Sequence, residues 1–169
     1  MDPLIVTLAL DDALHARLTA LRHRHFPPER NHLDAHLTLF HALPGDQQPA
    51  IMAILRDTAR AEAPRPARVS GLMDLGGGVA FRVDVSGLPA LHRTLQRRFD
   101  PWLTRQDRQG LRPHVTVQNK VSRDRARTTL ETLRAEHDPF EGVATGLQLW
   151  HYRGGPWDHA ATFPFEATT

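Results

Sequence analysis

The chain has 169 residues, of which 40% are apolar and 24% charged, so it is ordinary globular material of the size of one domain. It has no cysteine, which excludes disulfides and thiolate metal sites. The net charge is only +2 although the pI is about 9.9, because Lys120 is the only lysine and arginine carries the remaining basic charge. The composition therefore argues against a protein that coats nucleic acid, and any nucleic-acid contact is expected to be local.

The beginning of the chain resembles neither a signal peptide nor a membrane anchor. Residues 1–3 carry no basic charge, and the apolar run 4–10 is too short to span a bilayer. We therefore expect a soluble cytoplasmic protein that forms a single domain over residues 1–169.

Strand and helix signals alternate along the chain. Apolar, β-branched runs bounded by turn residues predict strands at 4–10, 36–40, 68–75, 79–85, 111–121, 143–152 and 159–165. Apolar positions at helical spacing predict helices after Asp11 or Asp12, from Pro49, over 88–99 and after Ser122. The three glycines 76–78 predict a hairpin between the third and fourth strands.

Two short segments of the chain match each other. Residues 36–39 read His-Leu-Thr-Leu, and residues 114–117 read His-Val-Thr-Val. In a strand with one buried face, the histidine and threonine of each segment point away from the core, because side chains alternate between the faces. Each segment follows a strand and a helix, so two such units about a pseudo-dyad would set the two polar faces opposite each other.

This pairing predicts an acid/base site that needs no metal and no cofactor. A histidine has a pKa near neutrality, so of His36 and His114 one can accept a proton while the other donates one. The hydroxyls of Thr38 and Thr116 can donate hydrogen bonds to non-bridging phosphate oxygens. The combination favours displacement at a phosphodiester, with one histidine on each side of the phosphorus.

The paired segments resemble the two-histidine (2H) phosphoesterase superfamily, in its 2′-5′ RNA ligase-like branch. The similarity lies in residues 36–45 (HLTLFHALPG), 112–121 (RPHVTVQNKV) and 149–165 (LWHYRGGPWDHAATFPF). The resemblance implies an α+β fold with two pseudo-symmetric lobes, each a mainly antiparallel sheet backed by helices, and an active cleft between them. It also implies hydrolysis of 2′,3′-cyclic phosphate ends of RNA or of small cyclic nucleotides, with reversible 2′-5′ RNA joining as a related activity. Which histidine is the acid and which the base stays open.

Other residues are weaker candidates for substrate contact. Lys120 would share the strand face of His114 and Thr116 and could place a positive charge near a phosphate. Phe40 could stack on a base from the His36 face, or it could be a core residue between the lobes. Arg153 and Tyr152 are further candidates, because family members often carry a basic or aromatic residue near the cleft.

The remaining histidines and the tryptophans have simpler interpretations. His32, His36 and His41 could imitate a metal cluster, but their segment is predicted to be loop and strand. The tryptophans are interpreted as core or lobe-interface residues, at positions 102, 150 and 157. An RNA-binding module without turnover and a histidine-rich metal binder are the alternatives to an enzyme. We expect an RNA end or a nucleotide as partner, with no membrane, no protein partner and a monomeric state.

Overall fold

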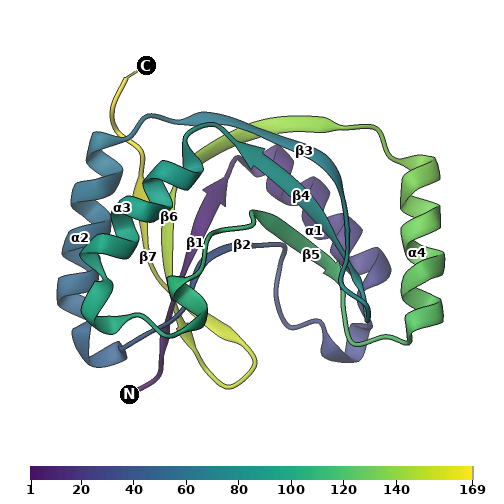
Figure 1. Cartoon of the computed structure of the whole chain (residues 1–169), viewed down its shortest axis with the longest axis horizontal. Helices are drawn as coiled ribbons and strands as arrows, with labels where there is room; N and C mark the ends of the chain where they lie inside the picture. Colours follow the sequence, from purple (N-terminus) through teal and green to yellow (C-terminus); the bar gives the residue numbers. More distant parts are fainter. Residues whose placement is uncertain (169) are drawn as a thin grey trace.

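The computed structural model describes residues 1–168 as one curled, seven-stranded sheet with four α-helices (Figure 1). The strands are β1 (Leu4–Leu10), β2 (Leu37–Leu43), β3 (Arg65–Asp74), β4 (Val79–Val85), β5 (His114–Gln118), β6 (Phe140–Tyr152) and β7 (Trp157–Pro164). The helices are α1 (Asp12–His25), α2 (Gln48–Ala61), α3 (Leu88–Arg98) and α4 (Arg123–Glu136).

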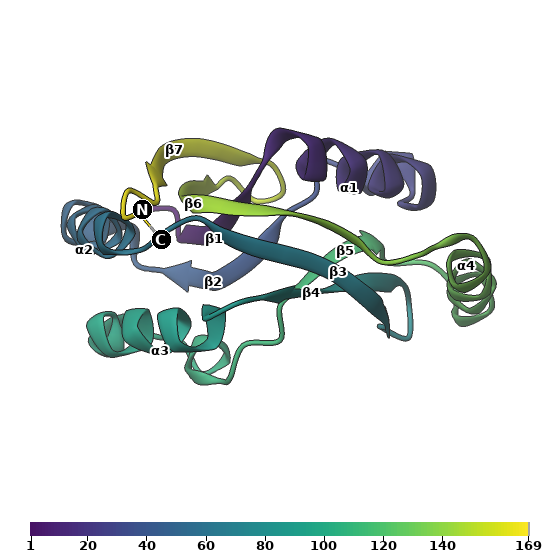
Figure 2. The ribbon, with the colours of Figure 1, turned by 90° about the horizontal axis from the view of Figure 1, so that it is seen from above.

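All strand pairs are antiparallel, and the long strand β6 connects two lobes. The order is β2-β1-β6-β3-β4-β5, and β7 also pairs with β6. The first part of β6 lies beside β3, and its remainder lies between β1 and β7. One lobe thus contains β1, β2 and β7, and the other contains β3, β4 and β5 (Figure 2). The predicted two-lobed α+β fold is confirmed, with one sheet running through both lobes.

The sequence signals at helix and hairpin ends act as expected. The side chain of Asp11 accepts a hydrogen bond from Leu14 N at 3.0 Å and caps α1, and Ser122 caps α4 in the same way. In the β3–β4 hairpin, Gly76 has φ of +82°, a conformation that favours glycine. A Cβ atom at Gly78 would lie only 1.9 Å from the carbonyl oxygen of Gln118, so glycine lets this hairpin approach the end of β5.

Strand β5 is shorter than the predicted strand 111–121. It begins after Pro113, which has no N–H to donate to the sheet. Beyond Gln118 the chain turns, because Lys120 adopts φ of +61° and its N–H bonds to the Asn119 side chain at 2.9 Å. The strand is therefore confined to five residues.

Each lobe covers the free edge of the other lobe's outer strand. Helix α1 packs against β5, and Arg22 donates a hydrogen bond from Nη1 to the carbonyl oxygen of Thr116 at 3.0 Å. From the other lobe, Nε2 of His92 in α3 lies 3.1 Å from the carbonyl oxygen of Leu39 in β2. These bonds give partners to backbone carbonyl groups at the sheet edges, which pairing between strands leaves free. They also hold the two strands that carry the His-Thr pairs.

None of the helices in residues 1–168 combines the length and the apolar composition needed to cross a bilayer.

Candidate active site

The alternation predicted for the two matched segments is present in the structure. Their apolar residues are all buried, with exposed fractions of 2% or less, at Leu37, Leu39, Val115 and Val117. The histidines and threonines of both segments are half-buried. Each segment thus anchors itself in the core through one face and offers an imidazole and a hydroxyl on the other.

The two imidazoles are held in the same way. Nδ1 of His36 lies 2.9 Å from the carbonyl oxygen of Asp34, and Nδ1 of His114 lies 2.7 Å from that of Arg112. A carbonyl only accepts, so each Nδ1 carries the proton and donates it. Within residues 1–168, Nε2 of each ring has no hydrogen-bond partner. Each neutral ring therefore presents Nε2 as a proton acceptor, and each protonated ring presents it as a donor.

The matched segments lie close together, although 78 positions separate His36 from His114 in the sequence. Strand β2 contacts β5 (Figure 1). Thr38 and His114 line one groove of about 780 Å³. We call it the polar groove; it is lined by Thr38, Leu39, His41, His92, Gln106, Asp107, Gln109, Gly110, Leu111, Arg112 and His114. Thr38 and His114 thus share one groove, whereas His36 lines a second cavity and Thr116 lines neither. His114 is near enough to His36 for its charge to lower the pKa of that imidazole.

The electrostatic environment keeps His36 neutral. Its pKa is lowered to about 4, mainly by burial and also by the charges of Arg22 and His114, against the hydrogen bond to Asp34 that raises it. Arg22 is itself 4% exposed, and burial lowers its pKa to about 10, so it remains a cation at neutral pH. A neutral imidazole with a free Nε2 is suited to accept a proton.

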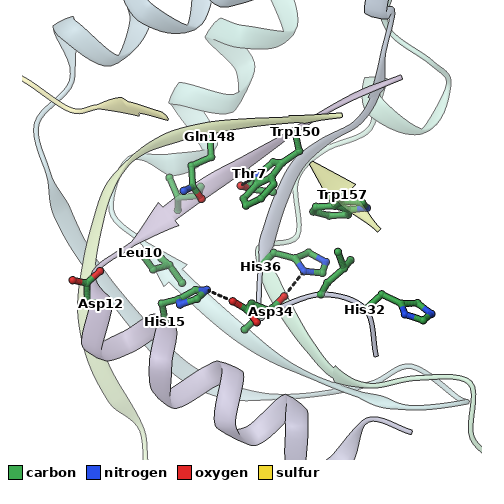
Figure 3. A pocket seen from close by; sticks show the side chains of 13 residues that line it. Thr7, Leu10, Asp12, His15, His32, Asp34, His36, Gln148, Trp150 and Trp157 are labelled. Carbon is green, nitrogen blue, oxygen red and sulfur yellow. Dashed lines mark hydrogen bonds and ion pairs between the residues drawn. The ribbon is translucent and has the colours of Figure 1, made fainter. Parts of the chain in front are cut away.

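A second cavity, which we call the aromatic pocket, contains the His36 side chain in its lining, whereas the polar groove does not (Figure 3). Its volume is about 490 Å³, and it is lined by Thr7, Leu8, Leu10, Asp12, His15, His32, Leu33, Asp34, Ala35, His36, Gln148, Trp150 and Trp157. The rings of His36 and Trp157 have centroids 4.5 Å apart, and Trp150 donates from Nε1 to the Thr7 hydroxyl at 2.9 Å. The pocket offers flat aromatic surface directly beside an imidazole.

Of the two placements expected for the tryptophans, core and lobe interface, Trp150 and Trp157 do not take the core one, because both are half-buried and line this pocket. A signal existed for Trp150: Leu147 and Leu149 are fully buried, so Gln148 and Trp150 belong to the opposite face of β6. For Trp157 the sequence carries no such signal, because the strand that holds it begins at this residue. Trp102 is half-buried and lies near Phe99, at 6.2 Å between ring centroids, as interpreted.

The prediction that Phe40 could stack on a base is wrong, and the alternative of a core position is confirmed. Phe40 is fully buried, with its ring stacked on His92 at 4.8 Å and edge-on to Phe99 at 5.2 Å. The reason is that α3 covers this end of β2, which no local pattern in the strand indicates.

The face predicted for Lys120 does not continue past Thr116. Gln118 is 1% exposed and donates to the Thr129 hydroxyl of α4 at 2.7 Å, so it is part of the protein interior. Lys120 is exposed and lies two residues beyond the end of β5, in the left-handed turn. It lines neither the polar groove nor the aromatic pocket.

The comparison with known families agrees with this geometry. The sequence model of the 2'-5' RNA ligase superfamily matches residues 10–156. The chain belongs to this superfamily. No curated protein matches the chain.

Solved structures share the fold of this superfamily member over nearly its whole length. TT0787 of Thermus thermophilus is 19% identical with a TM-score of 0.73, covering 99% of this chain and 100% of that chain. LigT of E. coli in complex with NADP+ is 15% identical with a TM-score of 0.60, covering 98% and 99%. LigT in complex with 3'-AMP is also 15% identical, with a TM-score of 0.62 and coverage of 98% and 99%.

The two remaining candidates for substrate contact, Tyr152 and Arg153, lie at the turn between β6 and β7. Arg153 is bound by the carboxylates of Asp158 and Asp2, each at 2.7 Å. Tyr152 is 39% exposed. Neither lines the aromatic pocket or the polar groove. Residues 1–168 also bring together no group of three or more His, Asp or Glu side chains placed to hold a metal ion.

Proposed function

We propose that this protein is a metal-independent phosphodiesterase that opens 2′,3′-cyclic phosphates at RNA ends or in small nucleotides. The observation that carries the proposal is the matched pair of imidazoles, each fixed through Nδ1 on a backbone carbonyl with Nε2 free. Membership of the 2'-5' RNA ligase superfamily supports the same reaction class.

In the proposed hydrolysis, His36 is the base and His114 the acid. Nε2 of neutral His36 takes a proton from a water molecule, whose oxygen forms a bond to phosphorus. The bond from phosphorus to one ribose oxygen breaks, and that oxygen takes the proton from Nε2 of protonated His114. The low pKa of His36 supports this assignment of roles, which the sequence left open. The hydroxyls of Thr38 and Thr116 would donate to the non-bridging phosphate oxygens as charge develops on them.

We propose that the nucleobase occupies the aromatic pocket. The indole of Trp157 adjoins the His36 ring, so a base there would lie one sugar away from the phosphate between the histidines. Base stacking on an aromatic ring contributes about 1–3 kcal/mol and tolerates any base. RNA ends and single nucleotides are thus the proposed partners, and because both histidines come from one chain, a monomer suffices.

The proposal predicts that each histidine is needed for turnover. In His36→Ala and His114→Ala, kcat for a 2′,3′-cyclic mononucleotide should fall by about a hundredfold or more, the usual contribution of an acid/base group. The assay separates the 2′- and 3′-phosphate products by chromatography, with and without EDTA. His23→Ala is the matched control, because His23 is exposed on α1 and lines neither cavity.

One result would reject the two-histidine mechanism and another the enzyme itself. Full activity in either histidine variant would show that the pair is not the catalytic one. Binding of RNA oligomers by the wild type with their cyclic ends unchanged would favour the RNA-binding module without turnover. Loss of turnover in EDTA, restored by a divalent ion, would instead reject the metal-independent mechanism.

A further inference from the structure

A further imidazole, that of His41, lines the polar groove together with His114. His41 belongs to β2, and its side chain is 45% exposed. Its Nδ1 lies 3.0 Å from Oδ1 of Asp107, and its backbone N–H bonds to both carboxylate oxygens at 2.9 Å. The acid/base mechanism above does not use this ring, although it opens into the groove that contains Thr38 and His114.

Asp107 holds this ring in one orientation. The carboxylate is only 1% exposed and also accepts the backbone N–H of Ala42 at 3.0 Å. Burial raises the pKa of Asp107, but the hydrogen bonds from the His41 ring and from two backbone amides outweigh it, so the pKa is lowered overall. The carboxylate accepts the hydrogen bond of Nδ1 of His41, so Nε2 is the ring nitrogen left free to donate to an anion when it carries a proton.

The two cavities beside the reacting histidines differ in charge. The aromatic pocket contains the carboxylates of Asp12 and Asp34 and neither lysine nor arginine. The polar groove contains Arg112, and Asp107 is its only carboxylate among the lining residues. Every oxygen of that carboxylate already accepts hydrogen bonds from the protein. An anionic part of a ligand is thus favoured in the polar groove and disfavoured in the aromatic pocket.

From this contrast we infer that the polar groove is a subsite for a second phosphate of the substrate, held by His41 and Arg112. The inference rests on the proposed function and names its substrate class. The ligand is a nucleotide whose base lies in the aromatic pocket, whose reacting phosphate lies between His36 and His114, and which carries a further phosphate at its 5′ side. An RNA end has that phosphate, and a nucleoside 2′,3′-cyclic phosphate lacks it.

Ligand binding tests the subsite without requiring turnover. Isothermal titration calorimetry compares adenosine 3′-monophosphate with adenosine 3′,5′-bisphosphate, which differ by the second phosphate. A charge-assisted hydrogen bond should make the wild type bind the bisphosphate roughly tenfold or more tightly. In His41→Asn this gain in affinity for the bisphosphate over the monophosphate should shrink to less than about threefold. The asparagine amide can replace Nδ1 as the donor to Asp107, but it has no group at the position of Nε2.

Two further variants sharpen the comparison. His41→Gln should keep part of the gain, since its amide can reach the position of Nε2. His23→Asn, the same substitution on the exposed face of α1, should keep all of it.

Equal affinity of the wild type for both ligands would overturn the subsite, and so would an undiminished gain in His41→Asn. An equal loss of affinity for both ligands in His41→Asn would show that His41 only shapes the fold, which would also overturn it. If the wild type opens no cyclic phosphate yet shows a gain that His41→Asn removes, the subsite stands and the proposed reaction fails.

Discussion

The protonation state of His36 follows directly from its surroundings. Burial is the largest influence on its pKa, and the positive charge of Arg22 acts in the same direction. The resulting pKa of about 4 lies below the ordinary histidine value of 6.5, so the ring is neutral throughout the neutral pH range. A base must be unprotonated to act, so the lowered pKa allows His36 to accept a proton at more acidic pH values than an ordinary histidine.

The acidic limb of the pH–rate profile should report this shift. As pH falls through about 4, His36 gains a proton, and kcat/KM should fall tenfold per pH unit below that value. The measurement is kcat/KM on a 2′,3′-cyclic mononucleotide from pH 3.5 to 8, with circular dichroism at each pH to show that the protein stays folded. A decline already centred near 6.5 would contradict the proposed role of buried His36 as the base.

The residues of the site differ in how far the sequence predicts them. Period-two alternation suffices for His36 and His114, because the apolar neighbours of each fix which way the imidazole points. It fails for Phe40, which α3 covers, since nothing within a strand shows what packs on it. It also fails for His41, whose orientation depends on Asp107, 66 residues away in the sequence.

The edge strands β2 and β5 depend on side chains from the opposite lobe. Arg22 links α1 to the Thr116 carbonyl and also donates from Nε to Asn31 at 2.8 Å. Its guanidinium thus supports the strand of His114 while its charge lowers the pKa of His36. In the proposed reaction Arg22 would be a positioning residue, because one buried side chain contacts the strand of His114 and lowers the pKa of His36.

Arg22→Met should affect both the geometry and the protonation of the site. We expect kcat/KM to fall by about tenfold and the free energy of unfolding by about 1–3 kcal/mol, because the Thr116 carbonyl loses its partner. The acidic limb should also move to higher pH, since the nearby cation no longer opposes protonation of His36. Arg24→Met is the control, because Arg24 is 57% exposed and pairs with Glu136 on the surface. An unmoved acidic limb would contradict the electrostatic part of this role.

Elements were more predictable than their contacts. Capping by Asp11 and Ser122 and the glycines of the β3–β4 hairpin act over a few residues, so the sequence suffices to predict them. The crossing of α1 to β5 depends on the curl of the whole sheet and has no local signal. The end of β5 depends on the turn at Lys120, where φ is +61°, a conformation that is uncommon for residues other than glycine.

At the scale of the molecule, strand β6 makes the two lobes one structure. The pseudo-dyad between the matched segments could be predicted from the order of strand, helix and motif. The sharing of β6 by both lobes could not be predicted, because the sequence of residues 140–152 has the pattern of a single strand whichever lobe it joins. Since β6 pairs with β1 and β7 along one part and with β3 along the other, loss of either lobe removes partners from the same strand.

This arrangement predicts that the lobes unfold together. Leu55 in α2 and Leu133 in α4 are 0% and 2% exposed and belong to helices at opposite ends of the molecule (Figure 2). Leu55→Ala and Leu133→Ala should each lower the free energy of unfolding by about 2–5 kcal/mol.

In both variants the transitions followed by tryptophan fluorescence and by far-UV circular dichroism should coincide. Fluorescence reports mainly on the lobe that contains β1, β2 and β7, because two of the three tryptophans, Trp150 and Trp157, lie in β6 and β7. Circular dichroism reports on helices and strands of both lobes. If Leu133→Ala unfolds in two steps, with the fluorescence transition still at the wild-type midpoint, β6 does not couple the lobes. A single shifted transition means that the polar groove, which is lined by Thr38 of β2 and His114 of β5, exists only while both lobes are folded.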